Sequence, residues 1–461
     1  MDHMQPPTIR CLLYALPFLA TSAWGQLKEL PASVNEWGPY NETAVIIHAA
    51  ELLAVPGEPP ATQMSIVIEH GRVGDVREGY ATASELGLAD ALVIDLTDRF
   101  VLPGLMDGHT HITSTPSPTF RLDRVVQSDA HRAIWGAYNA EVTLLAGFTS
   151  IRDTAGLRGN SFDHVFALRD GIKLGKVPGP RLLVAGQGIG STASQGDFLG
   201  YRHDVMELLE SRAMCSGPPA CREAVRYQIK RGADFIKLAA TGWATGPSEF
   251  GDQQHMFFDE LEAAVQTAHL MGRRVTAHAT GLDGVKAALR AGVDSVEHGR
   301  VLDDEAVQLF NESGTYLVPT LLVTKQFIAD TDYVPGSANP IRTAEAQPLA
   351  PVAEQWFRSA RLAYEGGVKF AYGTDSAITP HGDNAQEFAM LVEGVGMSPM
   401  EAIVTATVNA AENFGLSDEV GTIETGKAAD IIAVASSPLD DITELERVRF
   451  VMRNGVVYKN E

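Results

Sequence analysis

The sequence of 461 residues is long enough for one large domain and a small accessory domain. Its hydrophobic content of 45% and charged content of 20% are typical of a soluble globular protein. The formal net charge of −22 at pH 7 argues against a nucleic-acid partner, because nucleic-acid binding calls for clustered Lys and Arg.

The N-terminal residues 1–25 have the pattern of a secretory signal peptide. Arg10 precedes an apolar run over residues 11–20, and small residues follow up to Gly25. The run is far shorter than the ~20 residues that span a bilayer, and no later segment resembles a membrane span. A disordered N-terminal extension is the alternative. Cleavage near Gly25 predicts a secreted or periplasmic protein without a membrane partner.

Two cysteines, Cys215 and Cys221, remain after this cleavage. They flank the short loop Ser-Gly-Pro-Pro-Ala. In an exported protein this arrangement suggests a local disulfide, and two unrelated thiols are the alternative.

Two β-rich regions lie near the chain ends, at residues 40–101 and 418–461. The first alternates at Met64–Glu69 and turns at Glu69–Arg72, whereas the second turns at Asn454-Gly455 between apolar runs. Neither region carries enough apolar surface for a core of its own. We therefore expect the two ends to pair into one small β-sandwich.

Residues 102–417 alternate between strands and helices, which indicates a parallel α/β fold. Amphipathic helical stretches include Glu260–Met271 and Gly284–Ala291. Short apolar strands are expected at Leu102–His111, Thr149–Asp153, Arg181–Gly186, Phe235–Thr241, Arg274–His278, Ser295–His298, Tyr316–Thr320 and Lys369–Asp375. Eight strands over about 270 residues match a (β/α)8 TIM-like barrel. A doubly wound open sheet is the rival, but no Gly-rich dinucleotide-binding fingerprint follows the first strand.

Metal-binding side chains occur at the ends of these strands, where a barrel carries its catalytic groups. His109 and His111 are two residues apart on one strand, so both can face the barrel mouth and hold one metal ion, which Asp375 completes. His278 and His298 can hold a second ion. Each residue alone is more often structural, but their joint occurrence in chain order indicates a metal centre. Four imidazoles and one carboxylate suit Zn²⁺ better than Ca²⁺ or Mg²⁺.

Lys237 lies in the fourth expected strand, within Phe-Ile-Lys-Leu. A protonated amine would be strongly repelled by two nearby cations, and lysine loses its proton readily in such surroundings. A neutral amine can combine with CO₂ to form a carbamate whose two oxygens bridge two metal ions. A strand lysine that reaches solvent is the alternative.

The set His-x-His, Lys, His, His, Asp resembles the binuclear amidohydrolase superfamily, and the likeness extends from about Ala44 to Val457. The phrases that carry it are Leu102–His111, Gly147–Asp153, Arg231–Lys237 and Gly426–Asp430. Within the superfamily, the sequence is most similar to the exported dipeptidases and carboxypeptidases that include Xaa-Pro dipeptidases and ochratoxinase.

This resemblance implies a metal-dependent amide hydrolase that releases a C-terminal amino acid from dipeptides or N-acyl amino acids, with ochratoxin-like amides among the candidates. It implies two divalent metal ions per chain, a carbamate on Lys237, a metal-bridging hydroxide as nucleophile, and Asp375 as the group that carries a proton to the leaving amine. The partner is a small-molecule amide or peptide, and relatives tend to form homo-oligomers.

Other activities of the same superfamily are the alternatives. Cyclic amidases, lactonases, and imidazolonepropionase- or deaminase-like enzymes remain open, although the last group usually works with one metal and without the strand-four lysine. A non-catalytic scaffold is disfavoured, because all six ligand positions are occupied.

The loop after the third strand departs from the family pattern. It reads Ser194-Gln195-Gly196-Asp197 where relatives often carry His-Gly-Asp, which weakens any transfer of substrate identity. A substrate carboxylate needs a cationic or hydrogen-bonding clamp. The candidates, each equally consistent with a surface position, are Gln195, Tyr201, Arg202, His203, Trp243 and His381.

Overall fold

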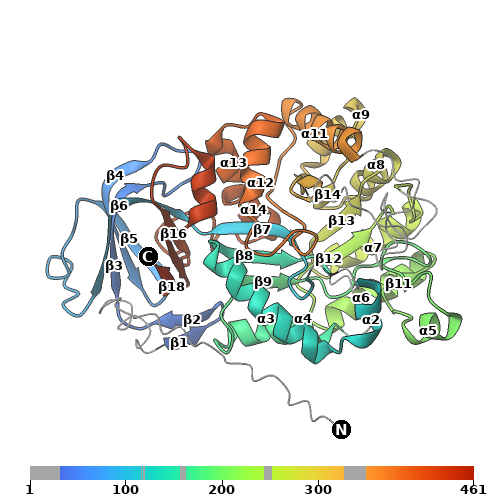
Figure 1. Ribbon diagram of the computed structural model, residues 1–461, viewed down its shortest axis with the longest axis horizontal. Helices are drawn as coiled ribbons and strands as arrows, with labels where there is room; N and C mark the ends of the chain where they lie inside the picture. Colours follow the sequence, from blue (N-terminus) through green and yellow to red (C-terminus); the bar gives the residue numbers. More distant parts are fainter. Residues whose placement is uncertain (1–31, 116, 118–119, 156–161, 243–251, 326–348) are drawn as a thin grey trace, which may run out of the picture.

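A computed structural model describes residues 32–115, 117, 120–155, 162–242, 252–325 and 349–461. The expected signal peptide at residues 1–25 and the candidate Trp243 lie outside these residues. A β-rich part, built from both chain ends, lies beside a larger α/β part (Figure 1). Within the described ranges, no helix combines the length and apolar character needed to cross a bilayer.

Both chain ends contribute strands to one mixed seven-stranded sheet. Its strands are β3 (Val45–Leu52), β4 (Ala61–Glu69), β5 (Arg72–Glu78), β6 (Leu92–Pro103), β16 (Ile431–Val434), β17 (Phe450–Arg453) and β18 (Val456–Asn460). They lie in the order β18-β17-β16-β6-β3-β4-β5. Because β6 pairs with β3 on one side and with β16 on the other, it joins the two ends of the chain, as the sequence predicted.

The strand pairing does not show the expected sandwich of two facing sheets, because strands from both chain ends belong to one sheet. The other described strands of this part, β1 (Ala32–Asn35) and β2 (Gly38–Asn41), make only a separate two-stranded ribbon. Side chains of β16 alternate instead between two clusters. Ile431 and Ala433 belong to the apolar cluster of the seven-stranded sheet, whereas Ile432 and Val434 belong to the main core of the α/β part. One face of the sheet therefore packs on the α/β part.

The α/β part contains two parallel sheets. The first consists of β7 (Leu105–Thr110), β8 (Phe148–Asp153) and β9 (Arg181–Val184), and the second of β12 (Ile236–Ala239), β13 (Val275–Ala279), β14 (Ser295–His298) and β15 (Tyr316–Val318). Two further short strands, β10 (Gly190–Ser191) and β11 (Met214–Cys215), pair beside them. Seven of the eight expected strands thus coincide with observed ones, within a few residues.

The eighth expected strand, Lys369–Asp375, is not assigned as a strand, but its backbone bonds to both neighbours. Ala371 N donates to Leu317 O of β15 at 3.0 Å, and Gly108 N of β7 donates to Tyr372 O at 2.8 Å. On the other side, Ala239 N of β12 donates to Ile189 O, just after β9, at 2.8 Å. These bonds connect the two parallel sheets and give the part a TIM-barrel-like α/β arrangement.

Helices cover the parallel strands. They are α2 (Phe120–Val126), α3 (Asp129–Leu145), α4 (Asp163–Lys173), α5 (His203–Leu208), α6 (Pro218–Lys230), α7 (Phe258–Leu270), α8 (Leu282–Ala291), α9 (Asp304–Ser313), α11 (Leu349–Glu365), α12 (Gln386–Ala389), α13 (Pro399–Thr405) and α14 (Val408–Phe414), with η1 (Met390–Val395) and η2 (Ile442–Arg447). Local chemistry sets their ends: Asp303 accepts from Ala306 N at the start of α9, and Gly314 ends it with a φ of 68°.

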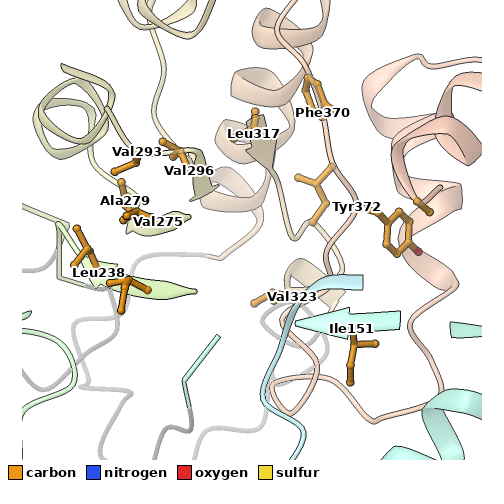
Figure 2. Close-up of a cluster of buried hydrophobic side chains, with 14 of the residues drawn as sticks. Ile151, Leu238, Val275, Ala279, Val293, Val296, Leu317, Val323, Phe370 and Tyr372 are labelled. Carbon is orange, nitrogen blue, oxygen red and sulfur yellow. The ribbon is translucent and has the colours of Figure 1, made fainter. Parts of the chain in front are cut away.

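The main hydrophobic core lies between the parallel strands and these helices. It combines strand residues with helical ones such as Val225 of α6 and Ala288 of α8. Figure 2 shows part of this cluster, with Ile151, Leu238 and Leu317 drawn from three different strands. Because these strands are buried on both faces, consecutive residues along them are apolar, and the sequence of this part shows short apolar runs where an alternating pattern would otherwise be expected.

The structure contains the Cys215–Cys221 disulfide, with the two Cα atoms 5.0 Å apart. It ties β11 to the first turn of α6, and both cysteines are buried.

We expect the double substitution Cys215→Ala and Cys221→Ala to lower the free energy of unfolding by about 2 kcal/mol, because closing so short a loop removes little chain entropy. Denaturant unfolding with and without the substitutions measures the difference. Thiol titration of denatured, unreduced protein should find no free thiol at these positions, and two free thiols would contradict the disulfide.

Candidate active site

The six candidate ligands are buried together at the ends of the parallel strands. Their exposed fractions lie between 1% and 7%, for His109, His111, Lys237, His278, His298 and Asp375. The rings of His278 and His298 have centroids 4.5 Å apart, and those of His109 and His298 are 4.9 Å apart. The parallel register explains this closeness, because Ala279, next to His278, pairs directly with His298.

Asp375 lies against the two histidines of β7. Its Oδ1 is 3.1 Å from His111 Nε2 and 3.7 Å from His109 Nε2. Asp375 N donates to His109 O at 2.7 Å, so the backbone fixes the carboxylate beside β7. Ligand atoms of His109, His298 and Asp375 all lie within 4.8 Å of one another, which makes these three residues a group able to hold a metal ion.

Lys237 and His278 are buried beside these three residues, but their nitrogen atoms have different surroundings. Lys237 Nζ is buried and has no hydrogen-bond partner. An unpartnered buried amine is costly, so this atom fits a position that is modified or faces a bound group. His278 Nε2 instead contacts Gly242 O at 3.0 Å, and His278 is not among the three residues with converging ligand atoms.

The ends of these strands carry strained backbone. Of the ten described non-glycine residues with positive φ angles, five lie at or just beyond the ends of these strands, with values from 50° to 98°: Ala155, His298, Thr320, Asp375 and Ala377. They are found at the ends of β8, β14, β15 and the eighth parallel segment. Strain of this kind persists where surrounding contacts over-determine the geometry, and it concentrates at functional sites. The strain therefore marks this end of the strands as the functional one.

Glu297 holds His109 in place, and the sequence reasoning assigned it no role. Its side chain is fully buried, and His109 Nδ1 donates to Glu297 Oε2 at 2.6 Å. Ser295 and Thr276 also donate to its Oε1. A carboxylate on Nδ1 leaves Nε2 free and directed toward a ligand, which is the usual outer support of a metal-binding histidine. The sequence feature that could have indicated this role is a glutamate within the short strand Ser-Val-Glu-His, because glutamate is rarely buried without a partner.

Arg152 supplies the countercharge of Glu297. The guanidinium is 3.5 Å from Glu297 Oε1, donates to Gly108 O at 3.1 Å, and lies between the rings of Phe235 and Phe414. Burial raises the pKa of Glu297, but His109, Lys237 and Arg152 outweigh that effect and bring it to about 2. Glu297 is therefore ionised at neutral pH.

Burial lowers the pKa values of the remaining nitrogen groups, which leaves the histidines neutral. It lowers the pKa of His109 to about 4, with help from the Lys237 charge, and it lowers those of His278 and His298 well below the ordinary value. Burial also lowers the pKa of Lys237 to about 8. Neutral imidazoles are the form that coordinates metal ions.

The substrate-contact candidates are dispersed. His381 is half-buried and contacts Ser114 O at 2.8 Å. Burial lowers the pKa of His381 to about 4. Gln195 is half-buried, and its Oε1 has no hydrogen-bond partner. Tyr201 is half-buried. By contrast, Arg202 and His203 are exposed and form surface pairs with Asp204 and Glu207, so the structure does not bring them into the cluster.

Comparison with known proteins identifies relatives over most of the chain. The model of the Amidohydrolase family matches residues 100–458. Ochratoxinase of Aspergillus niger is 29% identical, with 90% of this chain and 86% of that protein covered. Imidazolonepropionase of Thermoplasma volcanium is 25% identical, with 85% and 89% covered. The crystal structure of a Xaa-Pro dipeptidase with methionine bound in its active site has a TM-score of 0.81 and 34% identity, and the match covers 90% of this chain and all of that one.

We expect Glu297→Gln to weaken metal binding by about 10- to 100-fold, because the amide no longer accepts from His109 with a full negative charge. Competition of the purified protein against a chromophoric chelator measures the affinity. The exposed Glu393→Gln is the matched control and should leave it unchanged. An unchanged affinity in Glu297→Gln would contradict the supporting role.

Proposed function

The chain belongs to the amidohydrolase family, and on this premise we propose that it is a carboxypeptidase-like amidase. It releases a C-terminal amino acid from dipeptides or N-acyl amino acids, including ochratoxin-like aromatic amides. The observation that carries the proposal is the buried group of His109, His298 and Asp375 beside the unpartnered Lys237 amine. Further support comes from the similarity to ochratoxinase and to a dipeptidase that holds a free amino acid in its active site.

The donor set fits two divalent metal ions, and its imidazoles favour zinc. One ion would be held by His109, His111 and Asp375 and the other by His278 and His298, and a carbamate on Lys237 would supply further oxygen ligands. When bound, such ions supply Lewis-acid chemistry that polarises a carbonyl group and lowers the pKa of water. His278 must then turn its Nε2 away from Gly242 O or bind through Nδ1.

The protein's own groups move the proton. Asp375 is ionised, since its pKa is held well below the usual range by His109, His111 and Arg300 against the effect of burial. Its free carboxylate oxygen accepts a proton from the attacking water and passes it to the nitrogen of the leaving amino acid as the C–N bond breaks. Glu297 and Arg152 keep the His109 ring oriented throughout.

The proposal also includes the export of the enzyme, its domains and its oligomeric state. We propose that residues 1–25 direct export, which the Cys215–Cys221 disulfide supports because such bonds persist in oxidising compartments. Residues 40–101 and 418–461 form the accessory domain, and residues 102–417 form the catalytic domain, a closed (β/α)8 barrel. The active form is a homo-oligomer.

The similarity to imidazolonepropionase favours a second candidate, hydrolysis of a cyclic amide. Lys237 opposes it, because enzymes of that kind usually work with one metal ion and without the strand-four lysine. Both candidates can be tested with the same protein.

We expect zinc-loaded protein to release benzoate and phenylalanine from N-benzoyl-phenylalanine, and to act faster on linear amides with a free carboxylate than on cyclic amides. Chromatographic product analysis over a panel of dipeptides, N-acyl amino acids, hydantoins and lactones measures the preference. His109→Ala is the inactive control. Faster turnover of the cyclic substrates would overturn the carboxypeptidase-like assignment.

We expect Lys237→Ala to lose most of the bound metal, which elemental analysis should find near two ions per wild-type chain if the carbamate bridges them. A short carboxylic acid in solution should restore part of the metal content and activity, because it replaces the carbamate oxygens. The exposed Lys369→Ala is the control. An unmodified amine in metal-loaded, active enzyme, seen by crystallography, would refute the carbamate.

A further inference from the structure

Arg300 is a buried cation close to the candidate active site. It follows β14, two residues after His298, and is 3% exposed. Its Nη1 atom is enclosed without any hydrogen-bond partner, and the guanidinium forms neither a hydrogen bond nor an ion pair with a described residue. A charged group buried in this way is strongly unfavourable unless something else pairs with it.

The other buried arginines show how unusual this is. Among the described residues, Arg132, Arg152, Arg181 and Arg453 are equally buried, and each donates at least one hydrogen bond to a backbone or side-chain oxygen. Arg152 and Arg181 also have a buried carboxylate as partner. Arg132, Arg181 and Arg453 also have a buried nitrogen without a partner, but only Arg300 in this set has no side-chain hydrogen bond to a described residue.

The protein nevertheless holds Arg300 firmly. The guanidinium lies over the ring of Trp356, 3.8 Å from its centre, and Ser359 Oγ donates to Arg300 O at 2.9 Å. Trp356 and Ser359 both belong to α11. Before Arg300, His298 and Gly299 have φ angles of 77° and 54°, and a Cβ on Gly299 would be 2.6 Å from Leu317 Cδ1. The turn thus places the guanidinium against an aromatic plane and leaves its donors free.

Arg300 lies beside the reacting groups, because it is buried only two residues after His298. In agreement with this position, the charges of Asp375 and Asp252 affect the pKa of Arg300, and its own charge lowers the pKa values of His278 and His298. The planar fork of a guanidinium matches the two oxygens of a carboxylate. In the proposed substrates, that carboxylate is separated from the scissile nitrogen by a single carbon, so its binding position must lie next to the reacting centre.

We propose that Arg300, stacked on Trp356, binds the α-carboxylate of the amino acid that leaves, and so selects amides with a free carboxylate beside the scissile bond. This inference rests on the proposed function. It replaces the exposed Arg202 and His203 as the source of the carboxylate clamp.

The test compares wild type, Arg300→Met and Arg300→Lys on N-benzoyl-phenylalanine and its C-terminal amide, with benzoate release as the common readout. Wild type should prefer the free acid by at least about tenfold in kcat/KM. Arg300→Met keeps a long apolar stem on Trp356 but should lose about 100-fold on the free acid, mainly through KM, while its activity on the amide changes little. Arg300→Lys should lie in between, because it keeps the charge but not the fork.

Controls separate binding from folding. Arg361→Met changes an arginine of α11 itself, which pairs with Glu354 of the same helix, and should leave the acid-to-amide ratio unchanged. Metal content and thermal midpoint are measured for every variant, and guanidinium ion added to Arg300→Ala should restore part of the activity on the free acid. An equal loss on both substrates, or an unchanged acid-to-amide ratio in Arg300→Met, would overturn the proposal.

A binding assay keeps this inference distinct from the proposed function. Calorimetry of L-phenylalanine, the expected leaving product, should show binding to metal-loaded wild type and at least about tenfold weaker binding to Arg300→Met. If wild type hydrolyses neither N-benzoyl-phenylalanine nor its C-terminal amide, the proposed function fails. In that case, binding of L-phenylalanine that is present in wild type and lost in Arg300→Met still supports the carboxylate site. Equal binding to both proteins refutes it.

Discussion

The buried carboxylate of Glu297 is the interaction on which the rest of the site depends. It is fully enclosed, yet it is ionised because His109, Lys237 and Arg152 surround it. An isolated carboxylate in such a position would be very costly, so every neighbouring donor is also constrained by it. Through this group the histidine of β7 is connected to strands β8, β13 and β14, which supply Arg152, Thr276 and Ser295.

The functional side of the parallel strands is set by geometry at their ends. His298, the last residue of β14, has a φ of 77°, and Asp375 has a φ of 59° where its own segment ends. With such φ angles, successive side chains no longer point to opposite faces, as they do along a regular strand. They allow His298 and Arg300, two residues apart, to serve different purposes: His298 faces Thr320 and the ligand cluster, whereas Arg300 lies against Trp356.

Sequence patterns predicted the strands and proposed six ligands, of which the structure brings the ligand atoms of His109, His298 and Asp375 together. A histidine pair on one strand and single histidines at later strand ends remain recognisable without a structure, and seven of the expected strands coincide with observed ones. The roles of Glu297 and Arg300 were not predictable, because each is defined by partners, or by a lack of partners, on other elements. The strand pairing gives no evidence of the sandwich, since alternation shows that a strand has two distinct faces but not what covers each face.

Substrate contacts were the least predictable part for a related physical reason. Loop residues such as Arg202 carry a group that can bind a carboxylate, but Arg202 is exposed and already pairs with the neighbouring Asp204. An arginine becomes informative when the structure shows it buried and unsatisfied, and no sequence pattern reports that state. The chemistry of a side chain therefore identifies candidates, whereas its desolvation decides among them.

The eighth parallel segment is held against β7 by contacts between residues that are far apart in the chain. Thr374 and Asn384 both donate to the buried Asp107, and Asp375 N donates to His109 O. His109, His111 and Asp375 lie along this contact. An ion bound by these three residues would stabilise the contact, because ligands that converge only in the folded chain couple metal binding to folding. The position of the candidate ligands and the packing of the two segments therefore depend on the same few residues.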